Sequence, residues 1–163
     1  MPRKTSPPAA PSVRPPASEL ESHLGYWLRF VSNHVSIAFR AKVEAAGVSV
    51  SEWVVLRQLY DGHYTAAGAI AEAIGMTKGA VSKVVTRLEE KRLLERRILE
   101  EDRRQQGLAL TARGRALVPV LAHLADENDA EFFGHLPTRR RAELLALLRE
   151  LVRHHRLESV PVD

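Results

Sequence analysis

The sequence contains no cysteine among its 163 residues. This absence excludes a disulfide framework, thiolate-ligated zinc or iron–sulfur sites, a thiol nucleophile and a cysteine redox switch. No apolar run approaches the roughly 18 residues that a bilayer-spanning helix needs, and the N-terminus lacks the apolar core of a signal peptide. We therefore expect a protein of the reducing cytoplasm with no membrane partner.

Sequence motifs of common enzyme classes are also missing. A nucleophile elbow (G-x-S-x-G), a phosphate-binding loop (G-x-x-x-x-G-K-[ST]), a zinc protease motif (H-E-x-x-H) and a dinucleotide fingerprint (G-x-G-x-x-G) are all absent. Two adjacent histidines, His154 and His155, point about 100° apart on a helix and cannot chelate one ion together. We expect no enzyme, no cofactor and no bound metal.

Positive charge is concentrated in two stretches of a chain whose formal net charge is +4. Residues 77–115 contain 11 lysines and arginines against 6 acidic residues, and residues 1–18 contain three basic residues and no acid. A segregated surplus of this kind favours a polyanion that is bound by one local surface. The alternative is a pair of basic segments that are simply solvated.

The composition, 45% apolar and 27% charged, suits one globular domain preceded by an arm. Six of the nine prolines lie within residues 1–18, among serine, alanine and basic residues. Repeated proline with low hydrophobicity does not pack into a core. We expect residues 1–18 to form a disordered, Pro-rich basic arm.

A long first helix is expected over residues 19–46. Ser18 followed by Glu21 forms a capping-box pattern, and no proline follows before Gly47. One helical face, suited to a core, comprises Leu24, Trp27, Leu28, Val31, Val35 and Ala38, and a second apolar face comprises Tyr26, Phe30 and Ile37. The second face predicts contact with another helix of this chain or with a second subunit.

The pattern over residues 49–91 predicts three short helices. A second capping box, formed by Ser49 and Glu52, starts the first of them. Thr65 is placed to start the next helix, and Thr77 is placed to cap the third after a brief turn. Two helices joined by a three-residue turn are typical of a helix-turn-helix.

The remaining chain predicts a hairpin and two more helices. Residues 93–110 carry short apolar segments on both sides of a polar stretch, which indicates a β-hairpin. Thr111 is placed to cap a further helix, and Pro137-Thr138 begins the last one. The last helix carries one apolar stripe of Leu144, Leu148, Leu151 and Val152.

These elements, in this order, resemble the MarR family of winged-helix regulators over residues 20–155. The resemblance is carried by Ile70-Ala71, Gly75-Met76-Thr77, Val81-Ser82, Val85, Arg87-Leu88-Glu89, Arg96, Asp102-Arg103-Arg104 and Leu110-Thr111-Ala112-Arg113-Gly114. It implies a mainly α fold with a small β-hairpin wing and long N- and C-terminal dimerisation helices. Residues 47–114 would form a winged helix-turn-helix DNA-binding lobe, and residues 19–46 and 115–158 a helical dimerisation region of a homodimer.

The helix after Thr77 has one apolar side and one side suited to DNA. Val81, Val84, Val85 and Leu88 follow helical spacing and must face the core. The opposite side contains no acid, and we predict DNA contacts for Thr77, Lys78, Gly79, Ser82, Lys83, Thr86 and Arg87. Small, hydroxyl and basic groups fit a major groove about 12 Å wide. The alternative is an ordinary solvated helix face.

The hairpin tip, Asp102-Arg103-Arg104, resembles a wing that reaches an adjacent minor groove. Arginine suits a narrow groove because its planar cation is weakly hydrated and is attracted by the strong negative potential there. Asp102 would orient Arg104 through a charge-assisted hydrogen bond. The alternative is a surface turn with incidental charges.

One position departs from the family pattern. Arg92 stands where the family usually has glycine, at a helix end that suits a positive φ. A non-glycine residue in that conformation costs roughly 1 kcal/mol. We expect a differently shaped end of the preceding helix.

The resemblance to the MarR family also implies a small-molecule site between the first helix, the second helix and the DNA-binding lobe. Trp53 would line this pocket, and His34 with Arg57 would hold the carboxylate of a small aromatic or phenolic effector between apolar walls. The alternative for His34, which lies on the apolar stripe of the first helix, is an ordinary core histidine.

The sequence therefore predicts a DNA-binding transcriptional regulator. The resemblance implies a homodimeric repressor on double-stranded DNA with an inverted repeat, released by a small organic effector. An architectural double-stranded DNA-binding protein without an effector is the alternative, and weak sequence discrimination would favour it.

Overall fold

The computed structural model describes residues 17–62, 65–98 and 106–157. The chain divides into two compact units, Met1–Asn33 and His34–Asp163, whose boundary falls inside the first long helix. Residues 1–16 of the predicted arm lie outside the described part. Within the described residues, no helix is long and apolar enough to cross a membrane.

A short 3-10 helix, Leu20–Ser22, precedes α1, Leu24–Ala45. The capping box predicted at Ser18 is wrong, because no side chain caps the 3-10 helix. His23 has an extended backbone, so it separates the two helices and moves the start of α1 to Leu24. The Ser18 hydroxyl lies 3.3 Å from His23 Nε2 instead.

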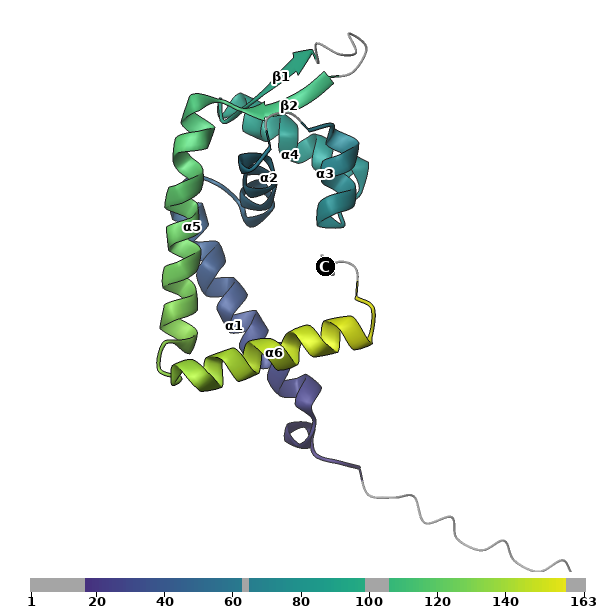
Figure 1. Cartoon of the computed structure of the whole chain (residues 1–163), viewed down its shortest axis with the longest axis vertical. Coiled ribbons are helices and arrows are strands. Elements are labelled where there is room, and N and C mark those ends of the chain that lie inside the picture. The colour runs from purple at the N-terminus through teal and green to yellow at the C-terminus, as the bar shows by residue number, and fades with distance from the viewer. Residues whose placement is uncertain (1–16, 63–64, 99–105, 158–163) are drawn as a thin grey trace, which may run out of the picture. The chain divides into compact units, whose positions relative to one another are not determined.

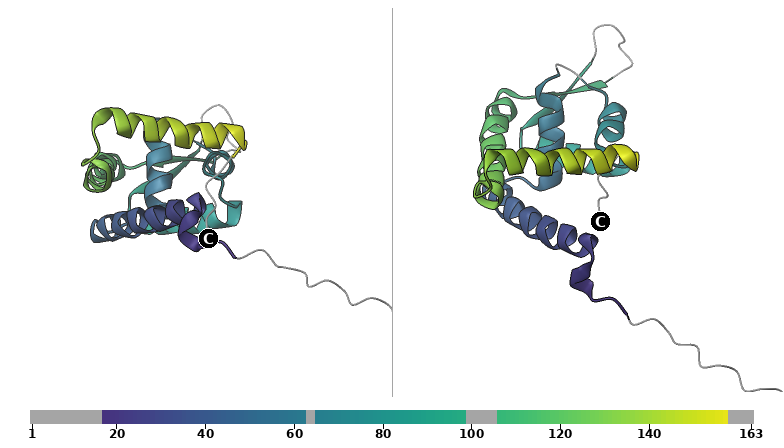
Figure 2. Two further views of the ribbon diagram at one scale, coloured as in Figure 1. Left: turned by 90° about the horizontal axis from the view of Figure 1, so that it is seen from below. Right: turned by 60° about the horizontal axis from the view of Figure 1, so that its bottom comes forward.

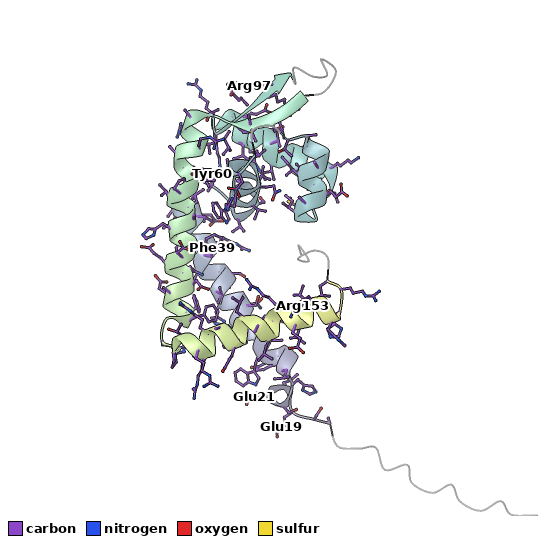
Figure 3. All side chains as sticks on the ribbon, in the orientation of Figure 1. Glu19, Glu21, Phe39, Tyr60, Arg97 and Arg153 are labelled. Atoms are coloured by element: carbon purple, nitrogen blue, oxygen red, sulfur yellow. The ribbon has the colours of Figure 1, made fainter. Side chains whose placement is uncertain are left out.

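The predicted core face of the first helix is largely exposed on this chain. Leu24 is 82% exposed and Trp27 is 46% exposed, whereas Val43 is the buried residue of α1. Phe39 packs against the core, on the side where α1 lies beside α5 (Figure 3). The sequence pattern therefore indicated apolar faces correctly, but the burial of the first face within one chain was a wrong prediction.

Three helices follow: α2, Val50–Tyr60, α3, Ala67–Ile74, and α4, Lys78–Glu90. The capping box of Ser49 and Glu52 is confirmed, since each side chain accepts a hydrogen bond from the other residue's backbone N–H. Thr77 is confirmed as the cap of α4. The helix-turn-helix formed by α3 and α4 is therefore present.

Thr65 does not cap α3, contrary to the sequence-based prediction. Ala66 occupies the capping position and its side chain makes no cap hydrogen bond. Thr65 instead exchanges two backbone hydrogen bonds with Leu108, at 3.2 and 3.0 Å. The Thr65 carbonyl thus accepts from Leu108, and the first backbone hydrogen bonds of α3 end at the Ala66 carbonyl instead.

The predicted hairpin is confirmed as β1, Leu94–Ile98, and β2, Gln106–Leu110, which pair antiparallel. Leu94 lies opposite Leu110 in this register. Figure 1 shows the hairpin at one end of the helical lobe, with α2, α3 and α4 beneath it.

Two long helices complete the chain, α5, Ala112–Phe133, and α6, Thr138–His154. Thr111 caps α5 as predicted, and α6 continues from the far end of α5 (Figure 2). Among its described residues, α6 buries none.

One hydrophobic core joins α2, α3, α4, the hairpin and the first half of α5. Its fully buried members include Leu56, Ile70, Leu88, Leu108 and Leu121. Each such side chain stabilises the fold by about 1.5–3 kcal/mol relative to full exposure. This core fixes α4 and the hairpin against each other.

Candidate nucleic-acid interface

The two sides of α4 are separated as the spacing predicts. Val81, Val84, Val85 and Leu88 are buried in the core. The outward side is exposed at every predicted contact residue, namely Thr77, Lys78, Gly79, Ser82, Lys83, Thr86 and Arg87. No acidic residue occurs from Thr77 to Leu88, so the exposed side has a positive potential.

The start of α4 is shaped for close approach by a ligand. Thr77 Oγ1 accepts a 3.2 Å hydrogen bond from the Ala80 backbone N–H, which leaves other first-turn N–H groups directed outward. A side chain added at Gly79 would meet nothing within 4 Å. The backbone is therefore accessible at this turn, where the helix dipole favours an anion such as phosphate.

A buried carboxylate connects α4 to α2. The Glu52 residue is 1% exposed, and its Oε2 accepts hydrogen bonds from the Ser49 backbone N–H and from Lys91 Nζ, both at 2.7 Å. Arg87 Nε lies 3.6 Å from Glu52 Oε1. Lys91 Nζ also donates to the Gly47 carbonyl at 2.9 Å, so the end of α4 is held to the turn between α1 and α2.

The surroundings of Glu52 keep its carboxylate charged. Burial alone raises the pKa of this carboxyl, but the hydrogen bonds from Lys91 and Ser49 and the charges of Lys91 and Arg87 outweigh burial. The resulting pKa lies below the ordinary value for glutamate. Arg87 is thus oriented by an internal acid while it remains on the exposed side of α4.

The corner between α4 and β1 contains a left-handed residue. The differently shaped helix end that we expected from Arg92 is wrong, because Arg92 adopts the positive φ that suits glycine. Arg92 has φ of 55°, and its neighbour Leu93 donates a backbone hydrogen bond to the Leu88 carbonyl at 2.9 Å. The Arg92 carbonyl accepts a 2.8 Å bond from Thr111 Oγ1. These hydrogen bonds fix the backbone on both sides of the corner, so Arg92 keeps its strained left-handed conformation.

The described part of the wing carries two further arginines. Arg96 Nε donates to Glu89 at 2.9 Å, which ties β1 to α4, and Arg97 pairs with Glu95 at 2.6 Å. The predicted contact residues of the tip, Asp102, Arg103 and Arg104, lie outside the described residues. Figure 3 shows Arg97 near the hairpin end.

The three predicted effector residues have separate surroundings. His34 is exposed on α1, which does not fit the alternative of a core histidine within one chain. Trp53 is half-buried against the core. Arg57 is exposed, pairs with Asp61 at 2.6 Å and has its guanidinium carbon 5.9 Å from the centre of the Tyr60 ring.

Lys91 lines two open hollows, and His34, Trp53 and Arg57 line neither. The smaller, about 340 Å³, is the surface of the Glu52, Arg87 and Lys91 cluster. The larger, about 600 Å³, lies between the α1–α2 turn, the end of α4 and α5. Sequence analysis missed both, because each combines residues that are distant along the chain.

A metal site finds no support in the described ranges, where no group of three or more His, Cys, Asp or Glu side chains could hold an ion.

Comparisons with known proteins agree with this geometry. A MarR family model matches residues 46–105, which contain α2, α3, α4 and β1. The Escherichia coli transcriptional regulator HosA is 25% identical over 109 residues, which cover 67% of this chain and 81% of HosA.

Solved structures are similar over most of the chain. Mycobacterium tuberculosis MarR family protein Rv2887 in complex with DNA is 26% identical with a TM-score of 0.68, covering 79% of this chain and 97% of Rv2887. Bordetella bronchiseptica BpsR, whose DNA binding is regulated by 6-hydroxynicotinic acid, is 25% identical with a TM-score of 0.71, covering 83% of this chain and 97% of BpsR. The helix-turn-helix and the paired wing thus give the chain a winged-helix fold like that of these structures, and its residues 46–105 match the MarR family model.

Proposed function

We propose that this chain is a MarR family transcriptional regulator, that it represses transcription as a homodimer on an inverted-repeat operator, and that a small aromatic acid releases it. The observation that carries the proposal is the exposed, acid-free side of α4 opposite its buried valines. A helix with this division offers its polar side to a major groove while the core holds it in place.

Each exposed group on α4 has a role in the proposed complex. Lys83 is free of any ion pair within the described residues and is suited to a phosphate or a guanine edge. Gly79 permits close approach of the backbone, and Lys78 and Ser82 flank it. Arg87 reaches DNA through the guanidinium nitrogens that Glu52 does not hold.

The wing supplies the second set of contacts in this proposal. Arg103 and Arg104 at its tip would enter a minor groove, with Asp102 orienting Arg104. Arg96 anchors the base of the wing to α4 through Glu89. The wing and the recognition helix then move as one body on DNA.

Dimerisation is supported by exposed apolar side chains on the long helices. On α6 the exposed set is Leu145, Leu147, Leu148, Leu151 and Val152. A helix that buries no residue of its own and exposes such a set is stabilised by a partner surface. Two copies would place their α4 helices about one DNA turn apart, which predicts half-sites with centres about 10 bp apart.

An aromatic acid effector is supported by two relatives. DNA binding by BpsR is regulated by 6-hydroxynicotinic acid, and Rv2887, in a structure 26% identical to this chain with a TM-score of 0.64, binds p-aminosalicylic acid. Release requires that the acid bind the DNA-free conformation more tightly than the DNA-bound one.

The test is DNase I footprinting on the DNA that flanks the gene for this protein, with and without aromatic acids. We expect one protected inverted repeat that is lost when an effective acid is added. Protection of all sequences alike would favour an architectural DNA-binding protein and would contradict the proposal.

The variant Lys83→Ala separates DNA contact from folding. It removes an exposed cation, so we expect a weaker complex whose logarithmic salt dependence falls by about 0.9 for each lost phosphate contact. The matched control, Arg149→Ala, removes an exposed cation from α6. Equal salt dependence in the two variants would argue against α4 as the recognition helix.

A further inference from the structure

The larger hollow next to Lys91 is an open groove lined by both apolar and charged side chains. Val48 and Leu93, both almost fully buried, form part of its lining, and Leu117 and Val120 from α5 add apolar surface. Its volume of about 600 Å³ is in the range of small-molecule sites, which is about 300–1,000 Å³. The groove is thus large enough for a compact organic molecule.

Three cations line the same groove. Lys91 is engaged by Glu52 and the Gly47 carbonyl, as described above. Arg92 and Arg113 are exposed, and within the described residues neither guanidinium has an ion pair or a side-chain hydrogen bond. Glu90 is the acidic residue of the lining, so the lining carries more positive than negative charge.

The backbone that carries these guanidiniums is rigid. Thr111 bonds to Arg92 through its hydroxyl and to Leu93 through its N–H, at 2.8 and 3.2 Å. Gly114 packs so closely on the Leu93 carbonyl that a β-carbon there would overlap with it. The α4–β1 corner and the first turn of α5 are therefore locked together, which pre-organises both sides of the groove.

Arg92 is a costly residue at its position. Its φ of 55° is one that glycine adopts without a steric penalty, whereas other residues lose about 1 kcal/mol there. Strained residues that the surroundings hold in place cluster at functional sites. A guanidinium kept at this corner, at the rim of an apolar groove, points to a use for its charge.

We infer that this groove binds a small anion with an apolar body, with Arg92 and Arg113 holding its carboxylate and the apolar lining its ring. Arginine suits this task because its planar donors pair with both oxygens of a carboxylate. The site differs from the one predicted at His34, Trp53 and Arg57. It deepens the proposed function, on which its regulatory part rests, by naming where an aromatic acid acts.

Occupancy of this groove would act on DNA binding through α4. The residues of the rim, Lys91 and Arg92, directly follow α4, and Arg87 lies one turn before Lys91 on the same helix. A bound anion would compete with the Glu52 carboxylate for the Lys91 ammonium group. This competition would change the ion pair between Glu52 and Arg87. Lys91 lines the groove and Arg87 belongs to the recognition surface, and both pair with Glu52. The Glu52 carboxylate thus connects the groove to the recognition surface.

The binding test uses the full chain, labelled with ¹⁵N and free of DNA, titrated with 1-naphthoate and followed by backbone amide shifts. We expect saturable shifts at Gly47, Leu93 and Leu117. The neutral isostere 1-naphthamide is the ligand control, and we expect it to bind at least about tenfold more weakly because it lacks the charge.

The test variant is Arg92→Gly combined with Arg113→Gln. Arg92→Gly relieves the left-handed strain, so loss of folding does not confound the result. We expect 1-naphthoate to bind this variant about tenfold or more weakly than wild type. The control variant, Arg149→Gln with Arg153→Gln, removes two guanidiniums from α6 and should bind like wild type.

Three results would overturn the inference: equal binding of the acid and the amide, undiminished binding to the double variant, or saturable shifts confined to other residues. Reduced DNA affinity of the double variant with unchanged naphthoate binding would instead assign the two guanidiniums to phosphate contacts. Because the titration contains no DNA, failure of wild type to footprint an operator would contradict the proposed function and leave the binding result standing.

Discussion

The ammonium group of Lys91, just after α4, donates a 2.7 Å hydrogen bond to the carboxylate of Glu52 in the first turn of α2. The same carboxylate accepts from the Ser49 N–H, which caps α2. One buried group therefore serves both as a helix cap and as the tie between the recognition helix and its support. Its removal should affect both roles together.

Replacing Glu52 with glutamine should destabilise the fold. The amide keeps the size of the side chain but leaves Lys91 and Arg87 without their counter-charge, and we expect a loss of about 1–3 kcal/mol. Urea unfolding at fixed protein concentration measures this loss. The control is Glu143→Gln, which breaks the exposed pair with Arg139 on α6 and should leave stability nearly unchanged. Equal effects of the two variants would refute a structural role for Glu52.

The contribution of Glu52 should depend on pH with a defined sign. Its pKa is lower in the folded than in the unfolded chain, so its charge stabilises the fold fully above the unfolded value near 4.5 and less as pH falls through the folded pKa. The gap in unfolding free energy between wild type and Glu52→Gln should shrink as pH is lowered from about 6 to about 3. A gap that is constant over this range would show that the charge is not responsible.

The sequence predicted the fold correctly where the residues that determine a feature lie close together in the chain. The Ser49–Glu52 capping box, the Thr77 cap and the buried valines of α4 each depend on residues within one helical turn, and all are confirmed. The predictions for Ser18 and Thr65 were wrong because other contacts override the local pattern. Thr65 pairs with Leu108, 43 residues away in a strand.

The charged cluster was not predictable, because its partners are far apart in the sequence. The neighbouring sequence identifies Glu52 as a capping residue. It does not indicate that Glu52 also accepts a hydrogen bond from Lys91, 39 residues later. Arg92 is the partial exception. Its departure from glycine was visible in the sequence, but the sequence did not show that Arg92 keeps the left-handed backbone or that it lines one groove with Arg113.

Arg92→Gly should raise the stability of the fold, unlike most substitutions at a folded position. Glycine adopts the left-handed backbone without a clash, and we expect a gain of up to about 1 kcal/mol after its greater freedom in the unfolded chain is counted. Thermal unfolding at fixed concentration measures it. Arg113→Gly, at a helical position of α5, should lower stability by up to about 1 kcal/mol. The same sign for both substitutions would contradict the strain at Arg92.

Gly114 and Gly79 should respond to alanine in opposite ways, although each lies in the first turn of a helix. A β-carbon at Gly114 would overlap with the backbone carbonyl of Leu93, which cannot move without displacing the α4–β1 corner. We therefore expect Gly114→Ala to cost more than about 2 kcal/mol. A β-carbon at Gly79 meets nothing within 4 Å, so Gly79→Ala should leave the fold intact or stabilise it by up to about 1 kcal/mol.

The Gly79→Ala variant should also differ from wild type in its affinity for DNA. Gly79→Ala adds a methyl group on the surface proposed to enter the major groove, so it should weaken the DNA complex severalfold while the protein unfolds at the same or a higher temperature. Circular dichroism melting and fluorescence anisotropy with a footprinted DNA site measure the two effects on the same samples. Unchanged affinity in this well-folded variant would place the recognition surface away from the first turn of α4, because a methyl group at a close backbone contact cannot be accommodated without displacing the helix.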